Sequence, residues 1–171
     1  MQPEQALFML HAALPSLQNE IGITQRVLDA VPADKGDYKP DAVCKSAFEL
    51  AWHIASAQNM FLDGICNGGF NFNNPKPESI KTMHDVTAWY AEHSKKNAQR
   101  LSELTGEQCA KVIDFRGMFQ LPAVTFLQFA LSHEIHHRGQ LSMYLRPMGA
   151  KVPAIYGESY DSAQAKKASA Q

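Results

Sequence analysis

Apolar side chains recur at three- and four-residue steps along four long segments of this chain, and this period limits its fold more than any other feature. In the first segment five residues carry the repeat and share one helical face: Leu17, Ile21, Thr24, Leu28 and Val31. A helix with one apolar face must bury that face against another element, so four such segments favour a helical bundle. The four predicted helices cover about residues 15–31, 46–67, 82–104 and 122–145.

Proline and capping residues mark the ends of these segments. Pro15 suits the first turn of a helix, and Pro32 cannot continue one. Ser46 and Glu49 have the spacing of a capping box, in which each side chain accepts a hydrogen bond from the other residue's backbone N–H. The remaining predicted helix starts are Thr82 and Pro122.

The connections between the segments are longer than simple hairpin turns. Residues 5–14 are predicted to form a shorter preceding helix, and residues 33–45 a loop. Residues 111–115 have a β-branched core and read as a short extended piece that is too brief to support a sheet. We therefore predict an all-α fold, a four-helix bundle with at least one crossover connection.

The composition is that of one soluble domain. A chain of 171 residues fits one domain, and 45 % hydrophobic residues exclude a disordered chain. We expect residues 1–161 to form a single helical domain, and residues 162–171 to form a polar, disordered tail or a loose terminal helix. Sixteen Lys and Arg against seventeen Asp and Glu leave a net charge of −1 without a basic cluster, so no nucleic-acid partner is expected.

Cysteine usage and the absence of targeting patterns indicate a cytoplasmic protein. The three cysteines are an odd number without CxxC spacing, which a reducing compartment explains most simply. The first residues lack the basic start and long apolar run of a signal peptide. No stretch approaches the roughly 18 apolar residues of a membrane span, so no membrane partner is expected.

Three of the seven histidines fall within one short stretch of the fourth segment. His133 and His137 are four residues apart, which places both on one helical face, about a turn apart. Two imidazoles at this spacing can bind one transition metal, although the pair alone also arises by chance. Apolar neighbours turn this face inward, where unpaired imidazoles are costly. His136 lies about 100° away from His137 around the helix and does not join the pair.

A third ligand is available in His53, near the middle of the second segment with apolar neighbours on both sides. Taken alone it is better explained as a core histidine, but beside an inward-facing pair it becomes the best candidate ligand. Three neutral imidazoles leave open positions on the metal, as in catalytic sites. Nitrogen ligands select weakly among zinc, nickel, iron and copper, and we expect zinc, nickel or iron. The other histidines, expected to be solvated, are His11, His84 and His93.

The same stretch also matches HExxH, the helix motif of zinc peptidases, with Glu134 as the general base. Glu158 lies 21 residues beyond His137, where some such enzymes place a third ligand. Three observations weigh against this interpretation. The residues after Gly139 do not complete the longer HExxHxxGxxH motif, no strands precede the helix to align a peptide, and Glu158 sits in a surface-like Gly-Glu-Ser stretch.

The residues that follow the histidine pair leave two alternatives open. Gln140 and Tyr144 are three and seven residues after His137, and they either line the same pocket or pack within the bundle. Arg138 either attracts an anionic substrate or pairs with a carboxylate of a neighbouring helix. We favour the pair, because a buried arginine is normally compensated.

Several motifs carry a resemblance to a known family. Residues 46–53 read SAFELAWH, a capped helix with a histidine, and residues 131–141 contain a match to an HxxxHRGQL signature. Residues 144–149 and 152–157 are similar to the usual ending of the same family. Over about residues 15–160 the chain therefore resembles the DinB-like (damage-inducible) family of bacterial proteins, which is related to thiol-dependent S-transferases.

The resemblance implies a bundle with an extended crossover, a divalent metal held by His53, His133 and His137, and commonly a homodimer. Characterised members of this family use a low-molecular-weight thiol, which the metal activates as a thiolate. We expect a metal-dependent enzyme of the thiol S-transferase type that acts on a small-molecule substrate, in detoxification or stress response, and we assign no catalytic base. The alternatives are a metal-binding protein without turnover and, less favoured, the zinc peptidase.

Overall fold

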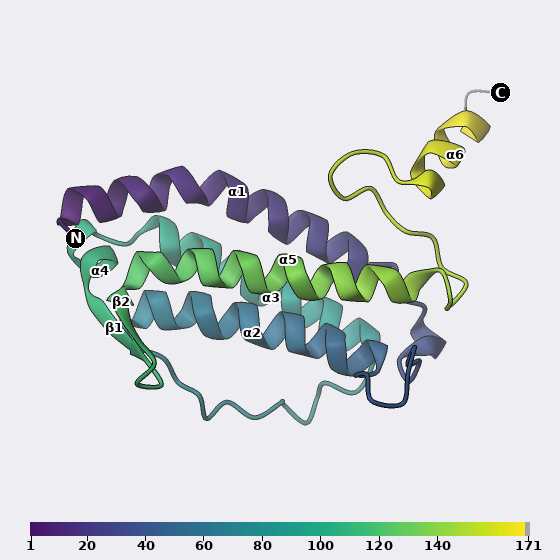
Figure 1. The fold of residues 1–171 in the computed structure, drawn as a ribbon, viewed down its shortest axis with the longest axis horizontal. Coiled ribbons are helices and arrows are strands. Elements are labelled where there is room, and N and C mark those ends of the chain that lie inside the picture. Colours follow the sequence, from purple (N-terminus) through teal and green to yellow (C-terminus); the bar gives the residue numbers. More distant parts are fainter. Residues whose placement is uncertain (170–171) are drawn as a thin grey trace.

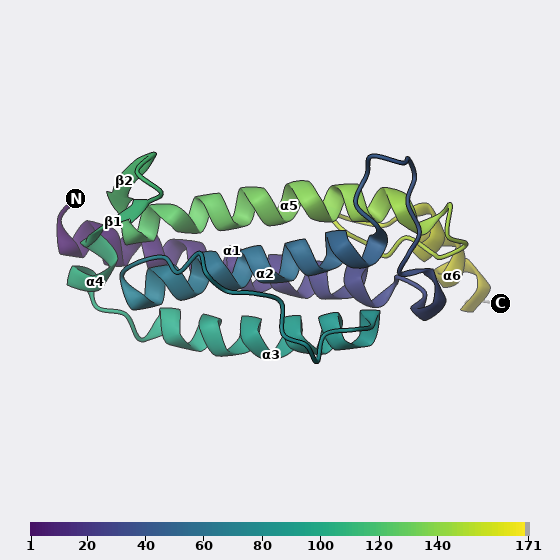
Figure 2. The same ribbon diagram turned by 90° about the horizontal axis from the view of Figure 1, so that it is seen from below.

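A computed structural model describes residues 1–169, and its four long helices lie side by side (Figure 1). These helices are α1 (Pro3–Asp29), α2 (Ala47–Asn67), α3 (Met83–Ser102) and α5 (Phe126–Leu145). Helices α2 and α3 run in the same direction, and Figure 2 shows residues 68–82 returning along the bundle between them. The predicted four-helix bundle with a crossover connection is confirmed.

Short elements surround the bundle. They are the 3-10 turns η1 (Ala33–Lys35) and η2 (Ala123–Thr125), the helices α4 (Gly106–Ala110) and α6 (Tyr160–Ser169), and the strands β1 (Val112–Phe115) and β2 (Phe119–Pro122). None of the helices in residues 1–169 has the length and apolar character needed to cross a membrane. Helix α6 buries no residue, residues 170–171 of the expected tail lie outside the described residues, and the domain boundary at residue 161 stays a prediction.

The predicted caps of the second and third long helices are present. Glu49 N donates to Ser46 Oγ at 3.1 Å, and Ser46 N donates to Glu49 Oε2 at 2.7 Å, so both halves of the capping box form. Thr82 and Asp85 make the same reciprocal pair at the start of α3. Each cap satisfies backbone N–H groups that have no partner within the helix, and thereby fixes where the helix begins.

Helix α1 continues through Pro15, which corrects the prediction that a long helix begins there after a shorter one. A proline inside a helix removes one hydrogen bond and crowds the preceding turn, at a cost of about 3 kcal/mol. The apolar face does not break at this point, because Leu10 before Pro15 and Leu17 after it are both fully buried. Packing of this continuous face outweighs the local preference of proline.

Residues 111–122 form a β-hairpin, which corrects the expectation that the segment is too brief for a sheet. Strand β1 pairs antiparallel with β2, and Phe115 lies opposite Phe119. Ile113 is buried, and the ring of Phe115 stacks on Phe61 of α2 with centroids 5.6 Å apart. Contacts with the bundle hold these two short strands, and such contacts leave no periodic signal in the sequence.

The fourth long helix begins at Phe126, after the predicted start at Pro122. Pro122 is instead the last residue of β2, where it lies opposite Val112. The fixed φ of proline is compatible with the end of a strand as well as with the first turn of a helix, so proline alone does not distinguish them.

Two apolar clusters fill the bundle, and a layer of buried polar side chains separates them. Along α1, Leu17 belongs to one cluster and Val27 to the other, and along α5 the same change occurs between Ala130 and Leu141. The buried polar residues between the clusters are Glu20, Thr24, Gln58, Ser94, Glu134 and Arg138. Because buried polar groups need partners, this layer specifies how the helices face one another.

The substitution Pro15→Ala tests the continuity of α1. Pro15 is exposed, so the change removes the disruption without removing core packing, and we expect the free energy of unfolding to rise by about 1–3 kcal/mol. Urea denaturation followed by circular dichroism measures the change. Pro3→Ala, in the first turn of α1, is the matched control and should change stability little. A loss of stability in Pro15→Ala would contradict a continuous helix.

Candidate metal centre

Three histidines from two helices converge on one side of the polar layer. His53 lies in the middle of α2, and His133 and His137 lie one turn apart on α5, which packs against α2. The ring centroid of His53 is 4.8 Å from that of His133 and 4.5 Å from that of His137. The two rings on α5 are 4.4 Å apart. All three side chains are half-buried, and they are the three residues predicted as ligands from the sequence.

The nitrogens of this cluster fit a single metal ion. His53 Nε2 and His137 Nε2 are 3.1 Å apart, and one nitrogen from each of the three rings lies within 4.8 Å of the others. Zinc–nitrogen bonds of 2.0–2.1 Å at tetrahedral angles place ligand nitrogens about 3.3 Å apart. The His53–His137 pair is therefore near ligand spacing, and the group as a whole is slightly more open. The three-histidine group can hold a metal ion, with positions left for other ligands.

Burial keeps the imidazoles of His53 and His133 neutral, which is the form that binds a metal. Burial, followed by the nearby imidazoles of His137, His53 and His136, lowers the pKa of His133 to about 4. Burial also lowers the pKa of His53, with smaller contributions from His137 and Lys45. At neutral pH both His53 and His133 therefore present a ring nitrogen with a free lone pair.

Gln140 orients the third ligand. Its Oε1 lies 2.7 Å from His137 Nδ1. An amide oxygen only accepts hydrogen bonds, so His137 Nδ1 is the donor and Nε2 keeps the lone pair that faces His53. Tyr144, the other residue whose place was left open, is buried in the core and donates to the backbone oxygen of Lys45 at 3.3 Å. Gln140 and Tyr144 both line a pocket with His137, and Tyr144 also packs in the core of the bundle.

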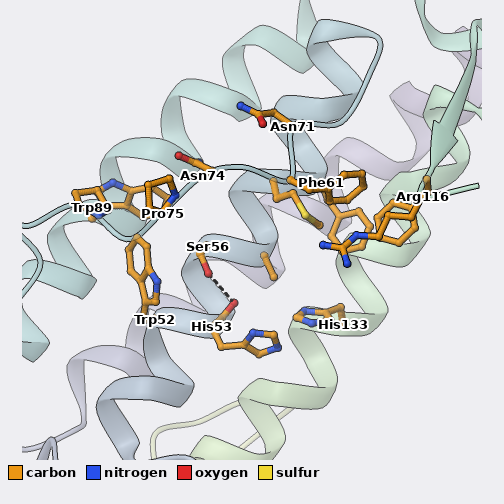
Figure 3. A pocket seen from close by; sticks show the side chains of 15 residues that line it. Trp52, His53, Ser56, Phe61, Asn71, Asn74, Pro75, Trp89, Arg116 and His133 are labelled. Atoms are coloured by element: carbon orange, nitrogen blue, oxygen red, sulfur yellow. Dashed lines mark hydrogen bonds between the residues drawn. The ribbon is translucent and has the colours of Figure 1, made fainter.

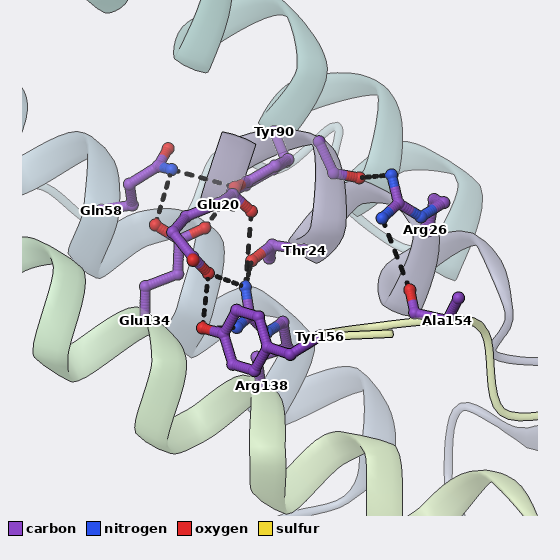
Figure 4. Close-up of polar contacts among 10 residues, drawn as sticks. Glu20, Thr24, Arg26, Gln58, Tyr90, Glu134, Arg138, Ala154 and Tyr156 are labelled. Atoms are coloured by element: carbon purple, nitrogen blue, oxygen red, sulfur yellow. Dashed lines mark hydrogen bonds and ion pairs between the residues drawn. The ribbon is translucent and has the colours of Figure 1, made fainter. Parts of the chain in front are cut away.

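Glu134 is buried in the polar layer, where its carboxylate lies beside Gln58 and Tyr90 (Figure 4). Its Oε1 accepts a short hydrogen bond from the Tyr90 hydroxyl, and its Oε2 accepts one from Gln58 Nε2 at 3.0 Å. Burial, followed by the charge of Glu134, raises the pKa of Tyr90 well above its usual value, so Tyr90 remains a donor. A carboxylate engaged in this way is not placed to act as a base at the histidines. Glu158, the other peptidase candidate, is exposed and pairs with Lys166.

Arg138 pairs with a carboxylate of a neighbouring helix, as predicted. Its guanidinium forms an ion pair with Glu20 of α1 and donates to Thr24 Oγ1 at 3.2 Å (Figure 4). Tyr156, from the segment after α5, accepts from Arg138 at 2.7 Å and donates to Glu20 at 2.9 Å. All these partners belong to the chain itself, so Arg138 is a structural residue and does not face a substrate.

A pocket of about 310 Å³ opens beside the cluster, with His53 and His133 in its wall (Figure 3). The crossover (residues 68–82), the β-hairpin and helices α2 and α3 supply the rest of the lining. The lining includes the side chains of Trp52, Phe72, Pro75, Trp89 and Arg116. The sequence did not predict this pocket, because its walls come from segments that are far apart along the chain.

The remaining histidines lie outside the cluster. His136 is exposed, and so are His11 and His84, as predicted. His93 corrects the expectation of a solvated side chain: it is half-buried and stacks on Trp89, with ring centroids 3.8 Å apart. Its Nδ1 also lies 2.9 Å from the Trp89 backbone oxygen, so His93 supports the tryptophan at the edge of the pocket.

Comparison with known proteins agrees with this fold. A family model described as the DinB family matches residues 5–168. The chain belongs to the DinB family. The match spans nearly all of the chain and confirms the resemblance carried by the capped second helix and the HxxxHRGQL segment.

Two Bacillus subtilis (strain 168) proteins are similar in sequence to this DinB-family chain. The uncharacterized protein YjoA is 32 % identical over 130 residues, which cover 74 % of this chain and 82 % of YjoA. The uncharacterized protein YrdA is 27 % identical over 150 residues, or 84 % of this chain and 86 % of YrdA. Both are named as uncharacterized, so they support the family and not a reaction.

Two crystal structures are similar in fold. The DinB-like protein YjoA of Bacillus subtilis matches with a TM-score of 0.73 and 28 % identity, over 86 % of this chain and 99 % of that chain. A DinB-like protein from Bacillus cereus ATCC 10987 matches with a TM-score of 0.72 and 26 % identity, over 84 % of this chain and 95 % of that chain. The helical fold is therefore that of other DinB-like proteins.

Substitution of the histidines tests the metal centre. We expect about one equivalent of metal per chain in protein purified without a metal-affinity tag, and loss of most of it in His53→Ala, His133→Ala and His137→Ala, because each removes one of three ligands. The adjacent His136→Ala, outside the cluster, should retain the metal. Elemental analysis measures the content. A parent protein that stays metal-free after zinc or nickel is added would exclude the site.

Gln140→Ala tests the orienting contact. Loss of a hydrogen bond that positions a metal ligand weakens metal affinity by about 10–100-fold, and we expect a change in this range. Competition with a chromogenic chelator measures the affinity. The matched control is Gln128→Ala, which removes an exposed glutamine of the same helix that bonds only to Ser132. Equal affinities in the two variants would show that Gln140 does not orient His137.

Proposed function

We propose that this protein is a divalent-metal-dependent enzyme of the thiol S-transferase type that acts on a small molecule. The observation that carries the proposal is the position of the histidine cluster. His53 and His133 form part of the wall of a pocket large enough for a small molecule, so a metal on the cluster is accessible to a ligand. Membership of the DinB family and the resemblance to thiol-dependent S-transferases support the choice of chemistry.

Zinc, nickel and iron each suit three imidazole ligands. A divalent metal bound there would lower the pKa of a thiol that enters an open coordination position, and would so supply a thiolate at neutral pH. In the proposed reaction the sulfur of a low-molecular-weight thiol forms a bond to a carbon atom of the electrophile. The bond from that carbon to its leaving group breaks, and the thiol proton departs with the leaving group.

The chain's own residues hold and orient the reactants. His53, His133 and His137 would hold the metal through ring nitrogens, and Gln140 fixes the ring of His137. The aromatic walls of the pocket offer an apolar surface to the reactants. No side chain is assigned as a general base, because a lowered thiol pKa makes a strong base unnecessary.

Two other functions are less well supported. A structural zinc site is closed by four protein ligands, whereas this cluster offers three beside a pocket, which favours turnover over simple metal binding. The zinc peptidase requires Glu134 to face the metal, and its carboxylate is hydrogen-bonded to Tyr90 and Gln58 instead.

We also propose that the protein acts in the cytoplasm, as a homodimer, in detoxification or stress response. All three cysteines are free, which agrees with a reducing compartment. Phe8 of α1 and Met143 of α5 are largely exposed, and large apolar side chains of this kind are common in subunit interfaces.

Thiol binding to the cobalt(II)-substituted protein tests the proposed function. We expect cysteine, cysteamine or glutathione to add a sulfur-to-cobalt charge-transfer absorption, and the zinc, nickel or iron form to convert the same thiol and an alkyl halide into the thioether, measured by mass spectrometry. Both signals should be lost in His137→Ala and kept in His136→Ala.

Two outcomes would contradict the proposal. Cobalt binding without a charge-transfer absorption for any of the three thiols would exclude thiol chemistry at this site. A charge-transfer absorption without thioether formation in any metal form would identify a metal-binding protein without turnover.

A further inference from the structure

The pocket beside the histidines has two chemically different ends (Figure 3). At one end Trp52 and Trp89 meet edge to face, with ring centroids 4.9 Å apart, and Pro75 of the crossover lies next to Trp89. At the other end the guanidinium of Arg116 reaches in from the β-hairpin, on the side of His133. A ligand that fills the pocket therefore meets an apolar surface, a cation and the candidate metal centre.

Arg116 has hydrogen-bond donors for which the structure shows no partner within residues 1–169. Its guanidinium lies over the ring of Phe72, 4.3 Å from the centroid, and this stacking leaves the N–H edge of the group free. Within residues 1–169 Arg116 takes part in no ion pair, and no acidic side chain lines the described pocket. The charge of Arg116 is therefore available to a ligand.

The backbone at Arg116 is unfavourable for an arginine. Arg116 has φ +56° and Gly117 has φ +70°, and Met118 N donates to the Phe115 oxygen at 3.0 Å, which together define a type I′ turn. Asparagine, aspartate and glycine suit the first central position of this turn, whereas a long side chain at positive φ is disfavoured. A strained residue whose side chain faces a pocket points to a role for that side chain.

We infer that Arg116 binds the carboxylate of a small substrate whose apolar group lies against Trp52 and Trp89. The inference rests on the proposed function, because it names the substrate class of the same site. A guanidinium matches a carboxylate with two parallel hydrogen bonds, and aromatic walls favour a flat or branched apolar group. A divalent metal on the histidines adds positive charge to the same pocket, which further favours an anion.

Tryptophan fluorescence reports on this pocket alone, because the chain has two tryptophans and both line it. The probes are 3-phenylpropanoate and its uncharged analogue 3-phenylpropanamide, titrated into the full chain with and without one equivalent of zinc. We expect the carboxylate to bind about tenfold more tightly than the amide in both conditions, because hydrogen bonds to a charged group are stronger than neutral ones.

Arg116→Asn separates recognition from a structural role. Asparagine removes the charge and suits the turn, so we expect the two probes to bind equally while the midpoint of thermal unfolding stays the same or rises. If Arg116 served only to hold the hairpin, the midpoint would fall and the preference for the carboxylate would persist. Lys151→Gln, which removes an exposed cation after the C-terminal end of α5, is the control and should keep the preference.

Equal binding of the two probes to the parent protein would overturn the inference, and so would a carboxylate preference that survives Arg116→Asn in the titration without zinc. The titration without zinc keeps this test separate from the proposed function. A preference for the carboxylate in a protein that binds no thiol would leave the anion site standing and reject thiol transfer. Thiol transfer without a carboxylate preference would support the proposed function and reject the anion site at Arg116.

Discussion

The ion pair between Arg138 and Glu20 fixes how α5 is rotated within the bundle. Arg138 is 1 % exposed, and a charge buried to this degree is tolerated only when it is fully paired. Glu134, one turn earlier, is held in the same polar layer. His133 and His137 each precede one of these buried residues by one position, about 100° around the helix. The rotation that buries the polar pair therefore also turns the histidine pair toward α2.

This arrangement explains why the HExxH match misleads. In a zinc peptidase the glutamate of the motif must face the metal along with the two histidines. In this chain Glu134 faces the interior, because Gln58 and Tyr90 provide donors there, and Arg138 continues the same inner face one turn later. The spacing of the histidines is a property of any helix and predicts their proximity. The direction of the glutamate depends on its partners in other helices, which the motif does not contain.

The same distinction separates what could be predicted from what could not. The capping box of Ser46 and the proximity of His133 and His137 depend on residues three or four apart, so local patterns predicted them. The passage of α1 through Pro15 and the pairing of the two short strands depend on packing against distant residues, which outweighs local propensity. His53 was the intermediate case, because it became a candidate only once the pair on another helix required a third ligand.

No local sequence pattern predicts the pocket, which exists because of the crossover connection. A bundle with short connections would leave the outer face of α2 and α3 open to solvent. Here residues 68–82 return along the bundle and bring Phe72 and Pro75 over that face, while the hairpin closes one end with Arg116. Phe72 meets both the Arg116 guanidinium and the ring of Phe115, so the crossover and the hairpin support each other. The long connection therefore walls a pocket beside His53 and His133, and Arg116 of the hairpin gives that pocket a positive charge.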